Sequence, residues 1–495
     1  MASADGKGES DAHHHTIRTV SLGTLWRVLR YPFLLLSVSL IPRMMGAETY
    51  GRYAFFMSVY MIFDNLTDIG STQVFGRFVP EYETAGEKGR SRFLLHGYLR
   101  YSTLLTLILI LGLLSASLIH PFEGFPFLWF LILSAILIFA KVEGILFGFV
   151  YGLNQIARFS AREAMRSAFT FALVFFLYWR YGLVGAFCGL ALNEVLLTVV
   201  ALAWTREPLG GRWPATRLRD FRPYLLFGIT FYVPMCLFSL LQRSGNILIP
   251  WFSHASKEEA YLQVAYFDIA NQFLLLTATF LGLIMSTLLP SLAALHTRGE
   301  HETVDRYHRV AMTYSAVLVF LAYNALGWLG RYAIAAVLGP TYAPVFPNAI
   351  LMILAISPGL IAYVGMNYAL LRKEPAVFTR GVLVGLAVMA LACWFLVPRW
   401  AAIGATWGTI VGYAALAVVF YARYGREFAA VLPDFWWATM IGLCFVPFYR
   451  FELDPAMAAA VYVATSFLYV SILFATRRIS FGDARRVLAA FRSKA

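Results

Sequence analysis

The sequence predicts an all-α polytopic membrane protein with about fourteen transmembrane helices. Of its 495 residues, 60% are hydrophobic and only 14% are charged, and the mean hydropathy is +0.68. Soluble domains are about half apolar and a quarter charged. Apolar runs of about twenty residues, each long enough to cross a hydrocarbon core of about 30 Å, recur along the whole chain. No stretch is left over for a soluble domain.

Hydropathy places fourteen candidate helices along the chain, of which the thirteenth is the shortest. They are predicted over residues 20–42, 51–78, 94–119, 127–151, 164–180, 183–204, 224–252, 260–290, 310–330, 345–370, 377–397, 401–422, 434–449 and 455–476. Four cysteines lie inside these apolar segments, at Cys188, Cys236, Cys393 and Cys444. We expect them to pack as small hydrophobic residues, without disulfides or metal ligation.

The helices are expected to fall into two halves. The segment 205–223, rich in Pro, Gly and Arg, follows the sixth helix and indicates a boundary. Residues 46–65 follow the first helix much as residues 254–273 follow the seventh, a weak echo that fits a transporter built from internal repeats. The predicted domains are a cytoplasmic tail over 1–19, an N-terminal six-helix bundle over 20–204, a linker over 205–223, a C-terminal six-helix bundle over 224–424, an appended helix pair over 425–476 and a basic cytoplasmic tail over 477–495.

Basic residues predict the orientation of the chain. If the N-terminus is cytoplasmic, the segments on that side hold about 27 Lys and Arg, against about 7 on the other side, and the positive-inside rule then places both termini in the cytoplasm. The N-terminus lacks the pattern of a cleavable signal peptide, and its His13–His15 triplet is interpreted as part of a disordered tail. The net charge of +13 is thus mainly a topology signal, and we expect no nucleic-acid partner.

Charged residues inside the apolar runs are the candidate functional residues. An intramembrane charge costs at least about 2.5 kcal/mol on insertion scales, so such residues are expected to line a cavity or to pair with each other. The candidates are Arg27, Arg30, Asp64, Asp68, Arg77, Lys141, Glu143, Glu194, Arg243 and Asp268. They gather in the first eight helices, whereas the interiors of the later helices are nearly free of charge.

Arg27 and Arg30 lie one helical turn apart at the start of the first apolar run. Beyond Arg30 this run continues for roughly 24 Å, which is too short to span a membrane alone, so both arginines are expected inside the span. Arg30 and Asp68 are predicted at about the same depth, about 15 Å from the cytoplasmic face, which allows them to pair. Snorkelling to the headgroups stays an alternative for Arg27, Arg30 and Arg243, and Lys141 has the alternative of a carboxylate partner within the bundle.

Residues 40–82, LIPRMMGAETYGRYAFFMSVYMIFDNLTDIGSTQVFGRFVPEY, resemble the opening signature of the Wzx-type polysaccharide flippases. This family belongs to the multidrug/oligosaccharidyl-lipid/polysaccharide exporter superfamily. The matching elements are a Gly-acidic-Tyr-Gly turn (Gly46, Glu48, Tyr50, Gly51), an Asp-x-Gly (Asp68, Gly70) and an Arg-x-x-x-Glu exit (Arg77, Glu81). LLPSLAAL at 288–295 is a weaker match. Where many relatives carry an Asp-Arg pair in the seventh helix, this chain has Gln242 and Arg243, which puts ion coupling through that acid in doubt.

The resemblance implies a V-shaped pair of six-helix bundles around a central cavity that alternates between the two faces of a bacterial inner membrane. It implies a lipid-linked oligosaccharide substrate, an undecaprenyl-pyrophosphate-linked sugar unit of O-antigen or exopolysaccharide synthesis. Polymerases or glycosyltransferases of the same pathway and membrane lipids are the implied partners. No cofactor is implied, and the driving force would come from ion gradients, from a partner that consumes the product or from substrate gradients.

Site roles follow from this resemblance together with the charges. Arginine's planar donor fork suits phosphate oxygens, so the expected pyrophosphate-binding residues are Arg27, Arg30, Lys141 and Arg243. Charge balance or ion coupling is expected of Asp64, Asp68, Glu194 and Asp268, and a cytoplasmic gate of Arg77 and Glu81.

Two alternatives remain from the sequence. A drug/cation antiporter of the same superfamily would use carboxylates facing aromatic walls, whereas here cations are at least as prominent. A membrane polymerase or glycosyltransferase would place its catalytic groups in a large outward loop, and no predicted outward loop exceeds about fifteen residues. The sequence offers no nucleophile-base set, no metal-ligand spacing and no Gly-rich phosphate loop, so we expect a transporter and not an enzyme.

Overall fold

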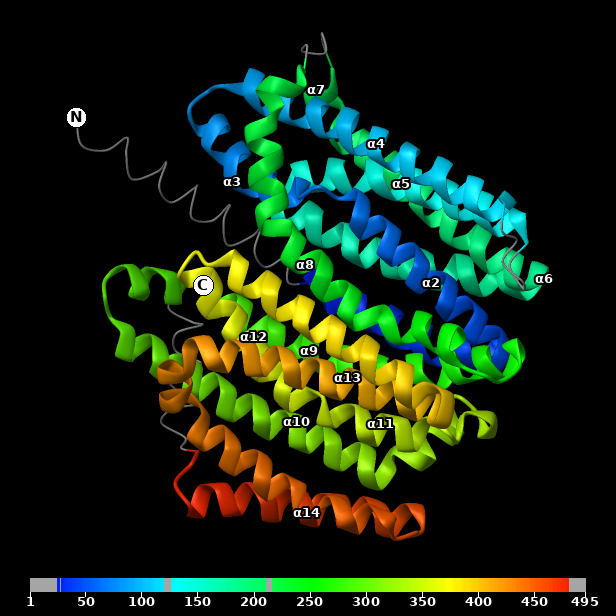
Figure 1. Cartoon of the computed structure of the whole chain (residues 1–495), viewed down its shortest axis with the longest axis vertical. Helices are drawn as coiled ribbons and strands as arrows, with labels where there is room; N and C mark the ends of the chain where they lie inside the picture. Colours follow the sequence, from blue (N-terminus) through cyan, green and yellow to red (C-terminus); the bar gives the residue numbers. More distant parts are fainter. Residues whose placement is uncertain (1–24, 27, 120–125, 211–215, 480–495) are drawn as a thin grey trace. The chain divides into compact units, whose positions relative to one another are not determined.

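The computed structural model describes residues 25–26, 28–119, 126–210 and 216–479 (Figure 1). Within these residues the regular structure is helical and no strand occurs, which confirms the predicted all-α class. A helix over Val28–Met45 comes first. The elements that follow are α2 (Ala47–Thr67), α3 (Ser71–Thr84), α4 (Lys88–Ile119), α5 (Phe127–Gly152), α6 (Ile156–Trp204), α7 (Arg206–Leu209), α8 (Leu218–Phe252), α9 (Lys257–Thr297), α10 (His301–Val337), η1 (Pro340–Tyr342), α11 (Val345–Leu354), α12 (Ile356–Leu371), α13 (Pro375–Leu443), η2 (Val446–Arg450) and α14 (Pro455–Ala475).

Several predicted helices are joined into longer ones. α6 covers the predicted fifth and sixth helices and turns at Gly182, whose φ of 62° lies in the left-handed region that glycine adopts without strain. α13 covers the predicted eleventh to thirteenth helices and leaves helical geometry at Ala401 and Tyr424. When the stretches on either side of each such turn are counted as separate helices, their number agrees with the predicted total of about fourteen.

The helices are suited to cross a membrane. In the described residues, seven helices are long and apolar enough to do so, or nine if each of two bent helix pairs is counted as one crossing. Two of these seven are continuous stretches of more than forty residues, Ile156–Trp204 and Pro375–Arg450, which contain more than one apolar segment. The chain is therefore a multi-pass membrane protein.

The predicted second helix, 51–78, is interrupted, and the prediction of one continuous helix is wrong there. α2 ends at Thr67, and α3 begins at Ser71. Asp68 Oδ1 accepts hydrogen bonds from the backbone N–H groups of Gly70 (3.2 Å) and Ser71 (3.1 Å), which stand at the start of α3. Gly70 has a left-handed φ of 81°, and a Cβ built on it would lie 2.4 Å from the carbonyl oxygen of Gly228 in α8. Close contact with α8 thus requires glycine at the break.

The described chain forms two compact units. One contains residues up to 45 and 56–239, and the other contains residues 46–55 and those from 240 onward. As a result α2 begins in the second unit and ends in the first, whereas α8 begins in the first unit and ends in the second.

Aromatic side chains form the core of the first unit at the end where α3, α4, α5 and α8 meet. The ring of Tyr98 lies edge-on to those of Phe75 and Phe221, with centroids 5.1 Å apart in both pairs, and all three side chains are buried. A Cβ at Gly97 would lie 2.3 Å from the Phe221 ring, so the absence of a side chain makes room for the ring. Small residues that allow such close approach are typical of helix packing in membranes. α4, α5 and α6 lie side by side in this unit (Figure 1).

In the second unit a buried asparagine holds α14 against α10. Asn324 Nδ2 donates to Thr465 Oγ1 (2.9 Å) and to Ser466 Oγ (2.8 Å), and its Oδ1 accepts from the Tyr449 hydroxyl (3.0 Å). Interhelical hydrogen bonds in membranes contribute about 0.6 kcal/mol each. Because several of them converge on one side chain, they fix the register of α14, the red helix of Figure 1, along α10.

Candidate functional site

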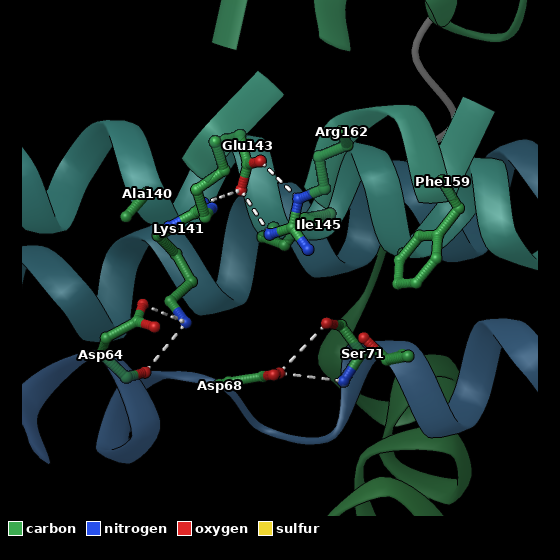
Figure 2. Close-up of a pocket in the computed structure, with 13 residues that line it drawn as sticks. Asp64, Asp68, Ser71, Ala140, Lys141, Glu143, Ile145, Phe159 and Arg162 are labelled. Atoms are coloured by element: carbon green, nitrogen blue, oxygen red, sulfur yellow. Dashed lines mark hydrogen bonds and ion pairs between the residues drawn. The ribbon is translucent and has the colours of Figure 1, made fainter. Parts of the chain in front are cut away.

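A charged cavity of about 220 Å³ lies in the first unit between α2, α3, α5 and α6 (Figure 2). Three carboxylates and three cations line it: Asp64, Asp68, Glu143, Lys141, Arg162 and Arg166. Ser71, Thr72 and Phe159 also line the cavity. A cavity with this many ionised groups in a membrane-spanning unit is costly to maintain and is a candidate functional site.

Lys141 of α5 is held by the end of α2. It is 4% exposed, and its Nζ lies 3.5 Å from Asp64 Oδ1 and 3.1 Å from the Asp64 carbonyl oxygen. α2 ends one turn after Asp64, so the last carbonyl groups of the helix need partners outside it. Figure 2 shows the ammonium group reaching both the carboxylate and the carbonyl. Lys141 therefore has the carboxylate partner that the sequence left as an alternative, and it still lines the cavity.

Two arginines of α6 converge on one carboxylate of α5. Arg162 forms a bidentate pair with Glu143: Nε donates to Oε1 at 2.6 Å, and Nη2 donates to Oε2 at 2.8 Å. Arg166, one turn further along α6, donates to the same Oε2 at 2.9 Å. The Glu143 side chain is 0% exposed, so it is a fully buried carboxylate with three charge-assisted hydrogen bonds.

Glu194, in the second half of α6, extends this network. Arg166 donates to Glu194 Oε1 (2.9 Å) and Oε2 (3.1 Å), and Asn193 Nδ2 lies 3.1 Å from Oε1. The turn at Gly182 folds the second half of α6 back, so that Glu194 reaches Arg166 on the first half. Removing one partner from such a buried ion pair leaves an uncompensated charge, which makes the network sensitive to each of its members.

Arg30 lies beside this network and does not pair with Asp68. Arg30 Nη1 is 3.1 Å from Glu163 Oε2, and its side chain is 42% exposed. Asp68 accepts instead from Ser71 Oγ at 3.0 Å, in addition to its bonds to the start of α3. The expected Arg30–Asp68 pair is therefore wrong, because the interruption of α2 turns Asp68 toward its own chain. Arg27 lies outside the described residues.

Arg77 and Glu81 lie away from the cavity, on α3. They are one turn apart, with Nη2 3.9 Å from Oε2, and both side chains are more than half exposed. They line a shallow surface depression together with Gly76, Pro80, Thr84 and Ala85. This arrangement is that of a solvated pair on a helix surface.

Arg243 and Asp268 come together in the second unit. Arg243 Nη1 of α8 lies 3.6 Å from Asp268 Oδ1 of α9. The Asp268 carboxylate is buried and accepts hydrogen bonds from the Tyr50 hydroxyl (2.8 Å), Asn246 Nδ2 (2.7 Å) and Gln272 Nε2 (2.7 Å). The arginine that lacks an acidic neighbour in its own helix thus obtains one from the next helix.

Sequence reasoning missed Arg162, Glu163 and Arg166. Hydropathy predicts a loop over residues 152–163, which contains Arg162 and Glu163, whereas α6 already begins at Ile156; Arg166 falls in the first turn of the predicted helix 164–180. The available signal was the spacing of Arg162 and Arg166, four residues apart in AREAMR and therefore on one helix face. Among the described residues, no group of three or more His, Cys, Asp or Glu is arranged to hold a metal ion.

Comparisons with known proteins support one family and one fold. A family model described as "Polysaccharide biosynthesis protein" matches residues 17–296. The structure is similar to that of the lipid II flippase MurJ in an inward closed conformation, with a TM-score of 0.68 and 11% identity over 93% of this chain and 99% of that one.

Two transporter structures are also similar. An inward-facing multidrug resistance MATE family transporter of the MOP superfamily gives a TM-score of 0.61 and 16% identity, over 82% of this chain and 98% of that one. A MOP superfamily transporter from Pyrococcus furiosus gives 0.52 and 15%, over 84% and 95%. No curated protein sequence matches the chain. At these identities the likeness concerns the fold.

Proposed function

Because this chain belongs to the polysaccharide biosynthesis protein family, we propose that it is a flippase for an undecaprenyl-pyrophosphate-linked oligosaccharide. Family membership confirms the resemblance predicted from the sequence. The proposed direction is from the cytoplasmic to the periplasmic leaflet of a bacterial inner membrane, with both termini in the cytoplasm. The chain is proposed to act as a transporter and not as an enzyme.

The observation that carries this proposal is the cavity with three cations inside a membrane-spanning unit. A lipid-linked sugar carries its negative charge on the pyrophosphate, and cations in a low-dielectric site attract such a group far more strongly than cations in water. Lys141 is 4% exposed and still lines the cavity, so it is desolvated and positioned for an anion.

In this proposal the carboxylates pair with the binding cations while no substrate is bound. Asp64 holds Lys141 while the cavity is empty, which avoids an unpaired buried cation. When a pyrophosphate enters, its oxygens take the place of the Asp64 carboxylate at Lys141. We propose the same role for Asp268 toward Arg243 in the second unit, and a gating role for the exposed Arg77–Glu81 pair.

A reconstituted transport assay tests the function. Purified protein in proteoliposomes is supplied with a fluorescent undecaprenyl-pyrophosphate-linked sugar, and its appearance in the opposite leaflet is measured by quenching. Lys141→Met and Arg30→Ala should each lower the rate about ten- to a hundredfold, the factor for a lost charge-assisted hydrogen bond. Arg30→Lys should also lose rate, because an ammonium cannot reproduce the bidentate fork.

Arg331→Gln is the matched control, since this arginine pairs with Glu452 at an exposed position, where a surface ion pair contributes little. Transport that is unchanged in Lys141→Met and in both Arg30 variants would contradict the assigned binding residues. Export of cationic dyes without movement of the lipid-linked sugar would favour the antiporter, and a change in the length of the glycan would favour the enzyme.

A further inference from the structure

The convergence of Arg162 and Arg166 on Glu143 points to a ligand site in addition to the binding residues Lys141 and Arg30. Glu143 Oε2 accepts from Arg162 Nη2 and from Arg166 Nη2, so one oxygen serves two guanidinium groups. Guanidinium groups bind phosphate oxygens with the same bidentate geometry that they use for carboxylates, so a pair of arginines that holds a carboxylate can also hold a phosphate. All three residues line the cavity, and the partly exposed side chains of Arg162 and Arg166 are accessible to an anion there, whereas Glu143 is fully buried behind them.

We propose that Arg162 and Arg166 form a phosphate clasp and that Glu143 is its resting anion, displaced when the pyrophosphate of a lipid-linked substrate binds. This inference rests on the proposed function, because it assigns the phosphate-bearing group of that substrate to these two side chains. Glu143 then acts as an internal competitor that weakens binding.

The clasp is preformed. The guanidinium carbon of Arg162 lies 5.4 Å from the ring centroid of Phe147 and 5.8 Å from that of Phe159, which holds the group by cation–π contacts. Because these contacts do not involve Glu143, the Arg162 guanidinium keeps its place when the carboxylate leaves. Figure 2 shows Phe159 at the edge of the cavity beside Arg162.

A phosphate group also satisfies the two arginines better than Glu143 does. A carboxylate has two oxygens, and here one of them is shared, whereas the pyrophosphate of a lipid-linked sugar, esterified at both ends, offers four non-bridging oxygens. Arg166 Nε is buried and has no hydrogen-bond partner within the described part of the chain, so one donor is unused at rest. The site therefore favours a phosphate over a carboxylate ligand.

Binding of pyrophosphate to the purified full-length protein in detergent tests the clasp. Radiolabelled inorganic pyrophosphate is the probe, measured by equilibrium dialysis. Glu143→Gln removes the competing charge and should tighten binding at least about tenfold, the factor expected for one charge-assisted competitor. Glu374→Gln, which removes a carboxylate paired with Arg423, is the control and should leave the affinity unchanged.

Adding Arg162→Met to Glu143→Gln should abolish the gain in affinity for pyrophosphate, and adding Arg166→Met should abolish it as well. Elution as a single peak in size-exclusion chromatography is required of every variant, and Glu143→Gln is nearly isosteric, so the test does not depend on a disruptive change. Unchanged or weaker binding by Glu143→Gln, or a gain that survives the loss of either arginine, would overturn the proposal.

Competition then identifies the source of the phosphate. Displacement of the probe by undecaprenyl pyrophosphate supports the clasp as a substrate site, and equal displacement by phosphatidylglycerol overturns that assignment. The transport assay separates the two proposals. Transport of the lipid-linked sugar that does not depend on Arg162 or Arg166 would reject the clasp alone. A pyrophosphate response to Glu143→Gln without any transport of the lipid-linked sugar would reject the proposed function alone.

Discussion

Replacement of Arg166 by Met should destabilise the first unit strongly. Arg166 makes three charge-assisted hydrogen bonds, two with Glu194 and one with Glu143. After the substitution Glu143 keeps both bonds from Arg162, but Glu194 keeps only the Asn193 amide as a side-chain donor among the described residues. The cost therefore falls on Glu194, which is 3% exposed.

The expected loss is about 3–5 kcal/mol in the free energy of unfolding, the range for removing one partner of a buried ion pair. The measurement is SDS-induced unfolding in detergent micelles, followed by tryptophan fluorescence. Arg166→Met with Glu194→Gln should recover most of the loss, because the second change removes the unpaired charge while keeping the shape of the side chain.

Arg331→Met is the matched control. It makes the same replacement in the exposed pair with Glu452, where the expected loss is below about 1 kcal/mol. If Arg166→Met unfolds at the same SDS fraction as Arg331→Met, or if Glu194→Gln deepens the loss, the carboxylates are not held by Arg166 as described.

Two further predictions concern the break after α2 and a surface pair. Gly70→Ala should lower the melting temperature clearly more than Gly86→Ala: both glycines have positive φ, which costs about 1–2 kcal/mol for alanine, but only at Gly70 does the new Cβ meet Gly228. Equal melting temperatures would show that contact with α8 does not matter. The hydrogen bond from Arg423 lowers the pKa of Glu374, so its stabilisation is present above the unfolded pKa of 4.5 and is lost as the pH falls below it. Glu374→Gln should flatten acid unfolding between about pH 5 and 3, and an unchanged profile would argue against this pair.

The membrane fold could be predicted from the sequence because its main cause is compositional. Apolar runs must cross the bilayer as helices, whatever they pack against. The turn at Gly182 falls between the predicted helices 164–180 and 183–204, since polarity and glycine mark it locally. The break before Gly70 is not marked by hydropathy, because it lies within one apolar run and involves close contact with Gly228 in a distant helix.

The site could be predicted only in part, for a related reason. Counting helical rise gives the depth of a charge in the membrane but not the direction in which it points. Arg30 and Asp68 were therefore matched by depth, although Arg30 pairs with Glu163. Arg162 falls in the predicted connection between two helices because hydropathy treats a charged helix end as a loop, and Arg166 lies at the start of the predicted helix 164–180; the partners of both come from other parts of the chain.

Residues 46–55 lie early in the sequence but belong to the second unit, and this affects how the protein can be divided into fragments. A cut between residues 239 and 240 separates the chain into two polypeptides, but the first of them carries a segment that the second unit needs. Tyr50 of that segment donates to Asp268, and Gly51 lies so close to the Tyr261 carbonyl that a Cβ would be 1.7 Å from its oxygen. The second fragment expressed alone would expose the surface that this segment covers. When the two fragments are expressed together, residues 46–55 of the first fragment can pack against the second fragment and so hold the two together.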